Sequence, residues 1–422
     1  MRELLEIFKL ELKALVRSRT VAMLVVASAA WMVVFPRMAK GDGTPAGMRE
    51  LVVHFSLGGV FALLVVSLFA SATGSVAGER AAKRLQLTLV RPVGRALVAL
   101  GKIAAHVAVG AGVLALACAI LAFTVDTSVP CSHVLSPAMR SPREEAKAMY
   151  AAYMADTNTP AEVRCAKKSI VLRLLENRAL DRYQAIPTNH VASWAFPAAT
   201  SYAPDAERAV RMRFAGHLEM RQSLHGVFRI GRIGGVVSNM TQSVLTIPLE
   251  KGGVSGDGPE DRLTFSNFGD SPVMIRPRRD LNLLVAADSF GWNLLRAFVS
   301  LVAMLALVVS LGVLLSSCLG RPVAIFVAFV MLIVGEISPS VVEQYPDELE
   351  TKLVDRIGLV ITRFAIGVTR PVSGLAPLGA LARDECIEPR EVAQLALADV
   401  VVIPAVLSLL AAIAMSRKQD DV

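Results

Sequence analysis

The sequence predicts a polytopic α-helical membrane protein with six transmembrane helices and a large extracytoplasmic α+β domain between the third and the fourth. Composition is the first observation behind this prediction: 54% of the 422 residues are hydrophobic and the mean hydropathy is +0.53, whereas a soluble domain is about 45–50% apolar. The second is that the excess gathers in uninterrupted apolar runs of about 20 residues, the length that crosses a bilayer. The third is that residues 126–290 contain no such run but are numerous enough for a domain of their own.

Residues 1–19 predict an amphipathic helix that lies in the membrane interface. At about 100° per residue, the apolar side chains fall on one face and the charged side chains on the other. The apolar face consists of Leu4, Leu5, Phe8, Leu12, Leu15 and Val16, and the charged face of Arg2, Glu6, Lys9, Lys13 and Arg17. An ordinary cytoplasmic cap remains the alternative.

The first three spans are predicted at Thr20–Phe35, Leu51–Val76 and Ala96–Val125. The loop at 78–102, between spans two and three, is strongly basic, with Glu79 as its one acid. Its cations are Arg80, Lys83, Arg84, Arg91, Arg95 and Lys102. Because Lys and Arg beside spans resist translocation, the loop and both chain termini are predicted on the cytoplasmic side. Gly110 and Gly112 predict close contact between the third span and a neighbouring helix.

The middle domain changes character along its length, from helices to a β-sandwich. Ser141 and Glu144 form a capping-box pattern with Pro142 between them, and the pattern recurs at Thr159–Glu162. From Val210 to Arg221 apolar and polar residues alternate, as in a strand with one solvated face. Further short strands are predicted at Trp194–Phe196, Val227–Ile230, Val244–Leu249, Leu263–Phe265, Val273–Ile275 and Leu281–Val285. Many short strands separated by turn residues are typical of a β-sandwich.

The C-terminal part predicts spans four to six at 291–317, 323–337 and 395–415, the last containing Asp399 and Pro404. Between spans five and six, an apolar helix carrying Arg356, Arg363 and Arg370 is predicted at the outer surface. A seventh crossing there is the alternative. The predicted division is therefore 1–19 interfacial helix, 20–125 spans one to three with the loop 78–102, 126–290 extracytoplasmic domain, 291–337 spans four and five, 338–392 extracytoplasmic amphipathic helices, and 393–422 span six with a cytoplasmic tail.

The chain lacks the motifs of several function classes. A phosphate-binding G-x-x-x-x-G-K-[ST] loop is missing from the sequence, since Gly94 and Gly101-Lys102 have the wrong spacing. Hydrolase and metalloprotease motifs are also missing, and His217 with His225 is too small a set for a metal site, so no enzyme, cofactor or metal is predicted in this chain. The net charge of +8 gathers beside the spans, which predicts contact with anionic membrane lipid and no nucleic-acid partner.

The cysteines predict one disulfide bridge. Cys131 and Cys165 both fall in the exported domain, where oxidation is permitted, and are the candidate pair. Cys386 is predicted on the same side of the membrane and competes for the bridge. Cys118 and Cys318 are predicted to be free thiols at or within spans.

The basic loop resembles the cytoplasmic loop of ABC-2-type ABC transporter permeases, which reads G-E, a basic stretch, G-T-L, an apolar run, P-V-S-R and then G-K. The matching residues are Gly78, Glu79, Leu85, Leu87, Leu89, Pro92, Val93, Arg95, Gly101 and Lys102. Lys83 and Arg84 stand where the family has Gly-Thr, and Gly94 where it has Ser. The resemblance covers residues 1–125 and 291–422, including the N-terminal helix, which is similar to the family's elbow helix.

This resemblance implies that the chain is the membrane subunit of an ABC exporter in a bacterial cytoplasmic (inner) membrane. It would pair with a second permease, as a homodimer or heterodimer, and with a separate cytoplasmic ATPase that holds ATP and magnesium. The implied coupling residues are Glu79, Arg80, Leu85, Leu87, Leu89, Pro92 and Arg95. Arg91 and Lys102, taken singly, are interpreted as topology signals that bind lipid head groups.

Two other functions stay open. The first is a non-transporting receptor or scaffold whose extracytoplasmic domain binds a periplasmic or envelope ligand or protein. The second is a polytopic membrane enzyme, which ranks last because Asp399, Glu336 and His54 are isolated in the sequence. The transported substrate is not specified by any motif.

Overall fold

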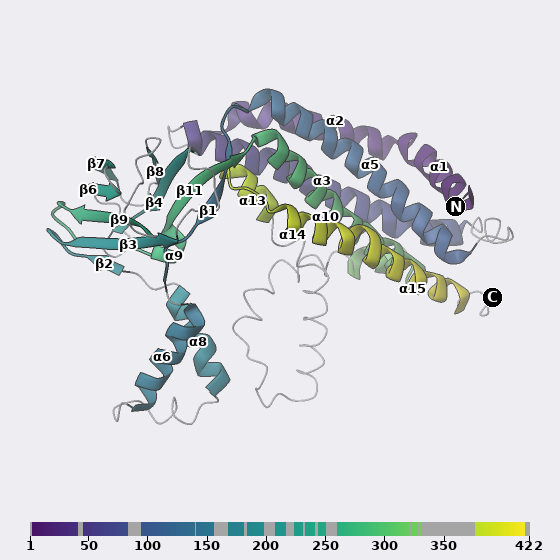
Figure 1. Ribbon diagram of the computed structural model, residues 1–422. Coiled ribbons are helices and arrows are strands. Elements are labelled where there is room, and N and C mark those ends of the chain that lie inside the picture. Colours follow the sequence, from purple (N-terminus) through teal and green to yellow (C-terminus); the bar gives the residue numbers. More distant parts are fainter. Residues whose placement is uncertain are drawn as a thin grey trace. The chain divides into compact units, whose positions relative to one another are not determined.

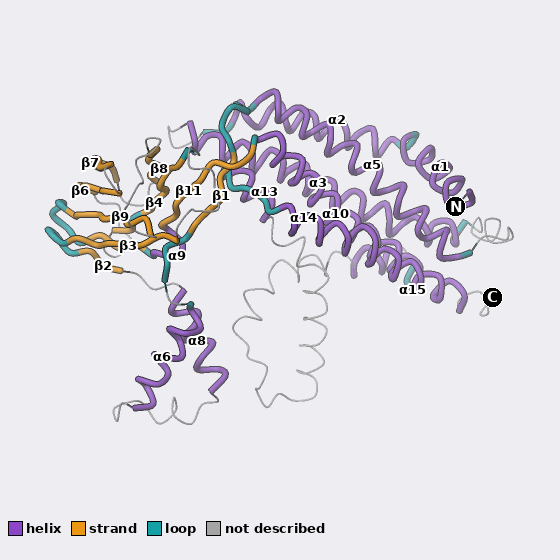
Figure 2. The backbone as a smooth tube through the Cα atoms, viewed as in Figure 1, coloured by secondary structure: helices purple, strands orange, loops and turns teal. Residues whose placement is uncertain are grey.

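The computed structural model describes most of the chain in well-defined segments. These are residues 2–40, 45–82, 94–139, 141–155, 168–180, 184–197, 207–216, 223–230, 233–240, 244–249, 260–320, 322–327, 330 and 376–417. They form two compact units, one made of Met1–Val129 with Ser289–Val422 and the other of Pro130–Asp288. The first is helical and the second contains the sheets (Figure 2).

The helical unit contains α1 (Arg2–Val16), α2 (Arg19–Met38), α3 (Pro45–Ala81), α5 (Arg95–Thr124), α10 (Phe290–Cys318), α13 (Ala376–Ala382), α14 (Pro389–Ala396), the π-helical turn η2 (Leu397–Val402) and α15 (Ile403–Arg417). Five described helices are long and apolar enough to cross a membrane: α2, α3, α5, α10 and the continuous helix α14–η2–α15. The chain is therefore a polytopic helical membrane protein with a sheet-containing region.

Within this unit α10 contacts α3, α5 and α15, while α1 lies against α5 and α2 against α3 (Figure 1). Two glycines explain the close approach. A Cβ on Gly110 would collide with Leu305 and Leu68, and one on Gly312 would lie 2.9 Å from Ala72 Cβ. The predicted packing role is thus confirmed for Gly110, whereas a Cβ on Gly112 would meet no atom within 4 Å.

α1 lies along α5, and the contact passes through another glycine. A Cβ on Gly101 would lie 2.7 Å from Ile7 Cγ2, so only glycine lets the two helices approach this closely. From the predicted apolar face, Leu15 is buried and Phe8 packs against the helical core, while Leu5 is exposed. α1 is therefore docked on the bundle along one side.

The end of the unit at which α3 and α10 begin is held by a loop that follows α13. Arg49 Nη2 lies 2.9 Å from Asp384 Oδ1. Asn293 Nδ2 donates to the carbonyl of Glu385 at 2.8 Å, and the N–H of Ile387 donates back to Asn293 Oδ1 at 2.9 Å. These bonds lie just before the helix α14–η2–α15, which begins at Pro389, six residues before the predicted start of span six at residue 395.

The second unit contains β1 (Cys131–Leu135), α6 (Pro142–Ala155), α8 (Lys168–Leu180), β2 (Gln184–Ile186), β3 (Val191–Pro197), β4 (Arg208–Arg213), β5 (Ala215–Gly216), β6 (Ser223–Ile230), β7 (Ile233–Met240), β8 (Val244–Leu249), β9 (Glu260–Asn267), β10 (Val273–Ile275), α9 (Pro277–Asp280) and β11 (Leu281–Asp288). The strands form three antiparallel sheets in the orders β1-β11-β4-β8, β2-β10-β5 and β3-β9-β6-β7. All three sheets contribute to one apolar core, in which the Phe214 and Phe265 rings stand 4.4 Å apart.

The predicted helical start of this unit is confirmed in part. Ser141 Oγ accepts from the N–H of Glu144 and Glu144 Oε2 accepts from the N–H of Ser141, both at 3.2 Å, so the capping box forms at the start of α6. The predicted order of helices followed by strands is wrong, because β1 precedes α6. β1 pairs with β11, far along the chain, and no local sequence pattern indicates such a partner.

The strand predictions succeed where a run is bounded by turns. β8 and β10 have the predicted bounds. The strand predicted from Val210 onward is shorter than expected, because β4 ends at Arg213 and a separate strand, β5, begins at Ala215. Several predictions fall outside the described residues, namely the second capping box at 159–162, most of span five, and the helix with Arg356, Arg363 and Arg370.

Candidate functional site: a buried charge cluster at the loop end of the helical unit

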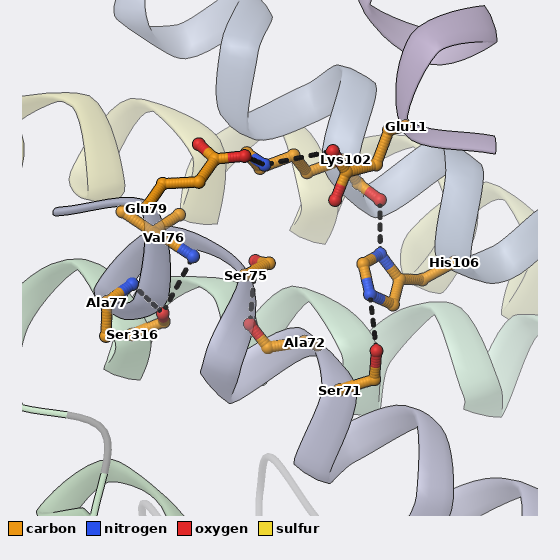
Figure 3. Close-up of polar contacts among 10 residues, drawn as sticks. All are labelled: Glu11, Ser71, Ala72, Ser75, Val76, Ala77, Glu79, Lys102, His106 and Ser316. Carbon is orange, nitrogen blue, oxygen red and sulfur yellow. Dashed lines mark hydrogen bonds and ion pairs between the residues drawn. The ribbon is translucent and has the colours of Figure 1, made fainter. Parts of the chain in front are cut away.

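The most concentrated polar contacts of the helical unit lie where α3 ends, α5 begins and α10 ends, which we call the loop end. Lys102 is the centre of this cluster (Figure 3). Its Nζ lies 2.6 Å from Glu79 Oε1 on α3 and 3.1 Å from Glu11 Oε2 on α1. One ammonium group therefore joins three helices, and we call Lys102, Glu79 and Glu11 the charge clasp.

The clasp exists because Lys102 cannot reach solvent. Its side chain is only 3% exposed, within an apolar helix, so the charged amine must be paired to offset its desolvation. Two carboxylates surround one ammonium, and Glu79 Oε2 is buried without a hydrogen-bond partner in the described part of the chain. Removing the ammonium would thus leave carboxylates that repel each other and have lost their counter-charge.

A histidine one turn further along α5 extends the network. His106 Nδ1 lies 2.8 Å from the carbonyl of Lys102, which can only accept, so Nδ1 carries the proton. Its other nitrogen, Nε2, lies 3.2 Å from the Ser71 hydroxyl of α3. The ring therefore links α5 to α3 a second time, below the clasp (Figure 3).

Arg80 and Ser316 tie α3 to the end of α10. Arg80 Nη2 donates to the carbonyls of Ser316 at 3.0 Å and Ser317 at 2.8 Å. Such carbonyls in the last turn of a helix lack intrahelical donors, and a cation there is favoured by the helix dipole. Ser316 Oγ in turn accepts from the N–H groups of Val76 at 3.1 Å and Ala77 at 2.9 Å.

Together these contacts connect α1, α3, α5 and α10 on both sides of the segment that joins α3 to α5. The arrangement offers rigidity and electrostatic pairing rather than a nucleophile or an acid–base pair exposed to substrate. Among the described residues no three His, Cys, Asp or Glu side chains are grouped so as to hold a metal ion.

The predicted coupling residues are distributed unevenly with respect to this cluster. Glu79 and Arg80 belong to it, and Arg95 is the first residue of α5 at the same end. The other four, Leu85, Leu87, Leu89 and Pro92, lie outside the described residues, so their role stays a prediction.

Sequence reasoning misjudged one member of the cluster and missed others. The interpretation of Lys102 as a head-group contact is wrong, because its amine is buried between carboxylates. Glu11, Ser71, His106 and Ser316 were not singled out. The available signal was the position of Lys102 well inside an apolar run, since an intramembrane charge calls for a partner.

The described cysteines divide into two kinds. Cys131 is disulfide-bonded, and so is Cys386, which the sequence analysis names as the competitor of Cys165 for the bridge. Cys118 is a buried free thiol. Cys165 lies outside the residues that the structure describes.

Comparison with known proteins assigns no relative. A scan against protein-family models, a search of curated proteins and a search of solved structures each return no match.

Proposed function

We propose that this chain is the permease subunit of an ABC-2-type exporter, which forms a transmembrane pathway and is driven by a separate cytoplasmic ATPase. The observation that carries the proposal is the charge clasp. It joins the Gly78-Glu79 and Gly101-Lys102 pairs, the two ends of the motif by which the loop resembles that family, through a 2.6 Å ion pair. ATP and magnesium would bind in the partner.

Coupling requires that motion of a partner subunit is passed to the membrane helices. An element that passes motion from a partner to membrane helices must be attached stiffly to those helices. The segment at 82–94 leaves α3 next to Glu79 and Arg80 and enters α5 seven residues before Lys102, and both attachment points are cross-linked by ion pairs and hydrogen bonds. A partner gripping that basic segment would therefore move α1, α3, α5 and α10 together.

The proposed orientation puts the loop end and both termini in the cytoplasm and residues 130–288 outside it, in a bacterial inner membrane. Two observations support this. The loop carries Lys and Arg beside spans. Cys131 and Cys386 are disulfide-bonded, and disulfides persist on the oxidising side of a membrane.

Identification of the partner tests the proposal most directly. The full-length chain is purified from its native membrane in mild detergent, and the co-purifying proteins are identified together with their ATPase activity and the number of permease copies. We expect an ATP-hydrolysing subunit and two permease chains, identical or homologous. A preparation that contains no ATPase under conditions that preserve lipid contacts would overturn the assignment.

The role of the clasp is tested by Glu79→Gln with Glu50→Gln as the matched control. Both residues lie on α3, but Glu50 is exposed at the opposite end. We expect Glu79→Gln to insert and to retain the ATPase, while ATP turnover in the complex reverts toward that of the isolated ATPase subunit. Glu50→Gln should behave as wild type. Equal turnover in the two variants would contradict a coupling role.

A receptor or scaffold is the second candidate, favoured by the fact that Pro130–Asp288 forms a compact unit with an apolar core of its own. Such a unit can bind an envelope protein or ligand without transport. The purification above separates the two functions: an envelope protein captured in place of an ATPase supports the second.

A further inference from the structure

A second buried charge of the helical unit lies far from the clasp, in the last span. Asp399 is 2% exposed, and its Oδ2 is buried without a hydrogen-bond partner among the described residues. An isolated carboxylate inside a membrane-spanning bundle is costly, and such residues mark ion or substrate pathways. The surroundings of this side chain therefore need an explanation.

The backbone around Asp399 is irregular. It lies in η2, the π-helical turn between α14 and α15, where the N–H of Ile403 donates to the carbonyl of Ala398, five residues back. Pro404 follows this turn and has no N–H, so the carbonyl of Val400 lacks the donor that a regular helix would supply. π-helical turns within α-helices occur frequently at functional sites. The regular α-helical hydrogen bonding is therefore interrupted beside Asp399.

Charged groups on the elements packed against η2 are all distant along the helix axis. Among the described elements, α10, α14 and α15 make the main contacts with η2, and their charged residues are Arg296, Arg390, Glu391 and Arg417. Arg390 precedes Asp399 by nine residues, about 13 Å along a helix, and Arg417 follows it by eighteen, about 27 Å. Arg296 points to the carbonyl of Ile387, twelve residues before Asp399. No described cation on these elements can therefore act as its counter-ion.

Hydroxyl donors on α10 are also committed elsewhere. Ser300 Oγ donates to the carbonyl of Arg296 at 3.0 Å, and Ser310 Oγ to that of Ala306 at 2.6 Å. Both serines are buried. The missing positive partner of Asp399 must come from outside the described side chains.

We propose that the carboxylate of Asp399 is a binding site for a small monovalent cation, a proton or an alkali-metal ion, inside the membrane-spanning part of the chain. Either ion neutralises the carboxylate: a proton converts it to a hydrogen-bond donor, and an alkali ion is held by its oxygens. Broken spanning helices bind coupling ions in this way in secondary transporters. This proposal does not depend on the coupling function of the clasp.

The test measures the thermal unfolding midpoint of the full-length chain in detergent, for the wild type, Asp399→Asn and the control Glu391→Gln. Glu391 lies on the same spanning helix but is exposed. In one arm Na⁺ or K⁺ replaces the bulky cation N-methylglucamine at constant ionic strength. In the other arm the pH is lowered from mildly alkaline to mildly acidic, and infrared difference spectra record the C=O stretch of a protonated carboxyl.

We expect the wild type and Glu391→Gln to gain about 2 °C or more in one arm, and Asp399→Asn to gain nothing in that arm. A response to Na⁺ or K⁺ identifies an alkali ion. A response to acid, with a carboxylic-acid band that Asp399→Asn lacks, identifies a proton. The reason is that an aspartate protonated in the folded state and ionised in the unfolded state makes the protein less stable as the pH rises.

Identical responses of wild type and Asp399→Asn in both arms would overturn the proposal. If Asp399→Asn fails to fold, Asp399→Leu replaces it, and a wild type that responds in neither arm refutes the site without any variant.

Discussion

Lys102 and Asp399 are two buried charges in the same helical unit, and their surroundings are opposite. Each is 2% exposed and each lies on a helix that can span a membrane. Lys102 has two carboxylates within 3.1 Å from two other helices. The buried Oδ2 of Asp399 has no partner in the described ranges. A charge that the fold itself neutralises holds helices together, whereas a charge that it leaves open calls for a ligand.

The largest expected effect comes from removing the paired charge. Lys102→Met leaves Glu11 and Glu79 facing each other without a cation, and breaking a buried pair in this way costs about 3 kcal/mol. Asp399→Asn changes a carboxylate that no described side chain pairs with, and it should cost less than about 1 kcal/mol. Unfolding in denaturant, followed in detergent, compares the two. The triple change Lys102→Met, Glu11→Gln and Glu79→Gln should recover much of the loss, and equal costs for the two single variants would erase the distinction between the sites.

The next effect concerns the docking of α1, which brings Glu11 to the clasp. Gly101→Ala places a Cβ 2.7 Å from Ile7 Cγ2 and should cost about 1–3 kcal/mol by overpacking. Gly112→Ala, on the same helix, meets no atom within 4 Å and should be neutral or stabilising by up to about 1 kcal/mol. Proteolytic release of residues 1–18, measured for both variants, would report undocking. Equal proteolytic release in the two variants would show that the close contact between Gly101 and Ile7 does not hold α1 in place.

A smaller effect tests whether neutral polar contacts support the clasp. Ser316→Ala removes the oxygen that accepts from the Val76 and Ala77 N–H groups and should cost about 1 kcal/mol. Ser317→Ala is the control, because its hydroxyl donates only to the carbonyl of Val313 in its own helix. A comparison of the thermal unfolding midpoints of the two variants measures how much the contact between α3 and α10 contributes to stability. A larger loss in Ser317→Ala would show that the α3–α10 contact contributes little.

The smallest effect is expected at a charged group that is neither buried nor paired across helices. Hydrogen bonds from the backbone N–H and the hydroxyl of Ser128 lower the pKa of Asp126, which is fully exposed just beyond α5. Because the folded pKa is the lower one, this contribution is present above about pH 4 and is lost as the pH falls through the folded value. The unfolding midpoints of wild type and Asp126→Asn should therefore converge in acid. A difference between the two unfolding midpoints that grows as the pH falls would contradict a stabilising role of the hydrogen bonds to Asp126.

The sequence sufficed for features that depend on local patterns. Apolar runs located the five described helices that are long and apolar enough to cross a membrane, and the capping box at Ser141 and Glu144 formed as predicted. It did not suffice where distant segments meet. Ser316 bonds to α3 from 240 residues away, and β1 pairs with the distant strand β11. Neither contact is visible as a periodic pattern in the sequence.

The same limit applied to the two charges. Lys102 and Asp399 were both visible as charges within apolar runs, but their partners were not. Whether such a residue is neutralised depends on which helices pack beside it and in what register. The partner Glu11 comes from α1, where it was one of several charged side chains on an amphipathic helix. The π-helical turn at Leu397–Val402 likewise had no sequence signal beyond Pro404.

The bond from α10 to α3 has a consequence for isotope exchange. The N–H groups of Val76 and Ala77 are covered by an oxygen that belongs to another helix, Ser316 Oγ. Deuterium uptake at these two amides therefore depends on how often α3 and α10 part, more than on fraying of α3 itself. Hydrogen exchange at these two amides therefore reports how often the contact between α3 and α10 opens, and the measurement needs no attached label.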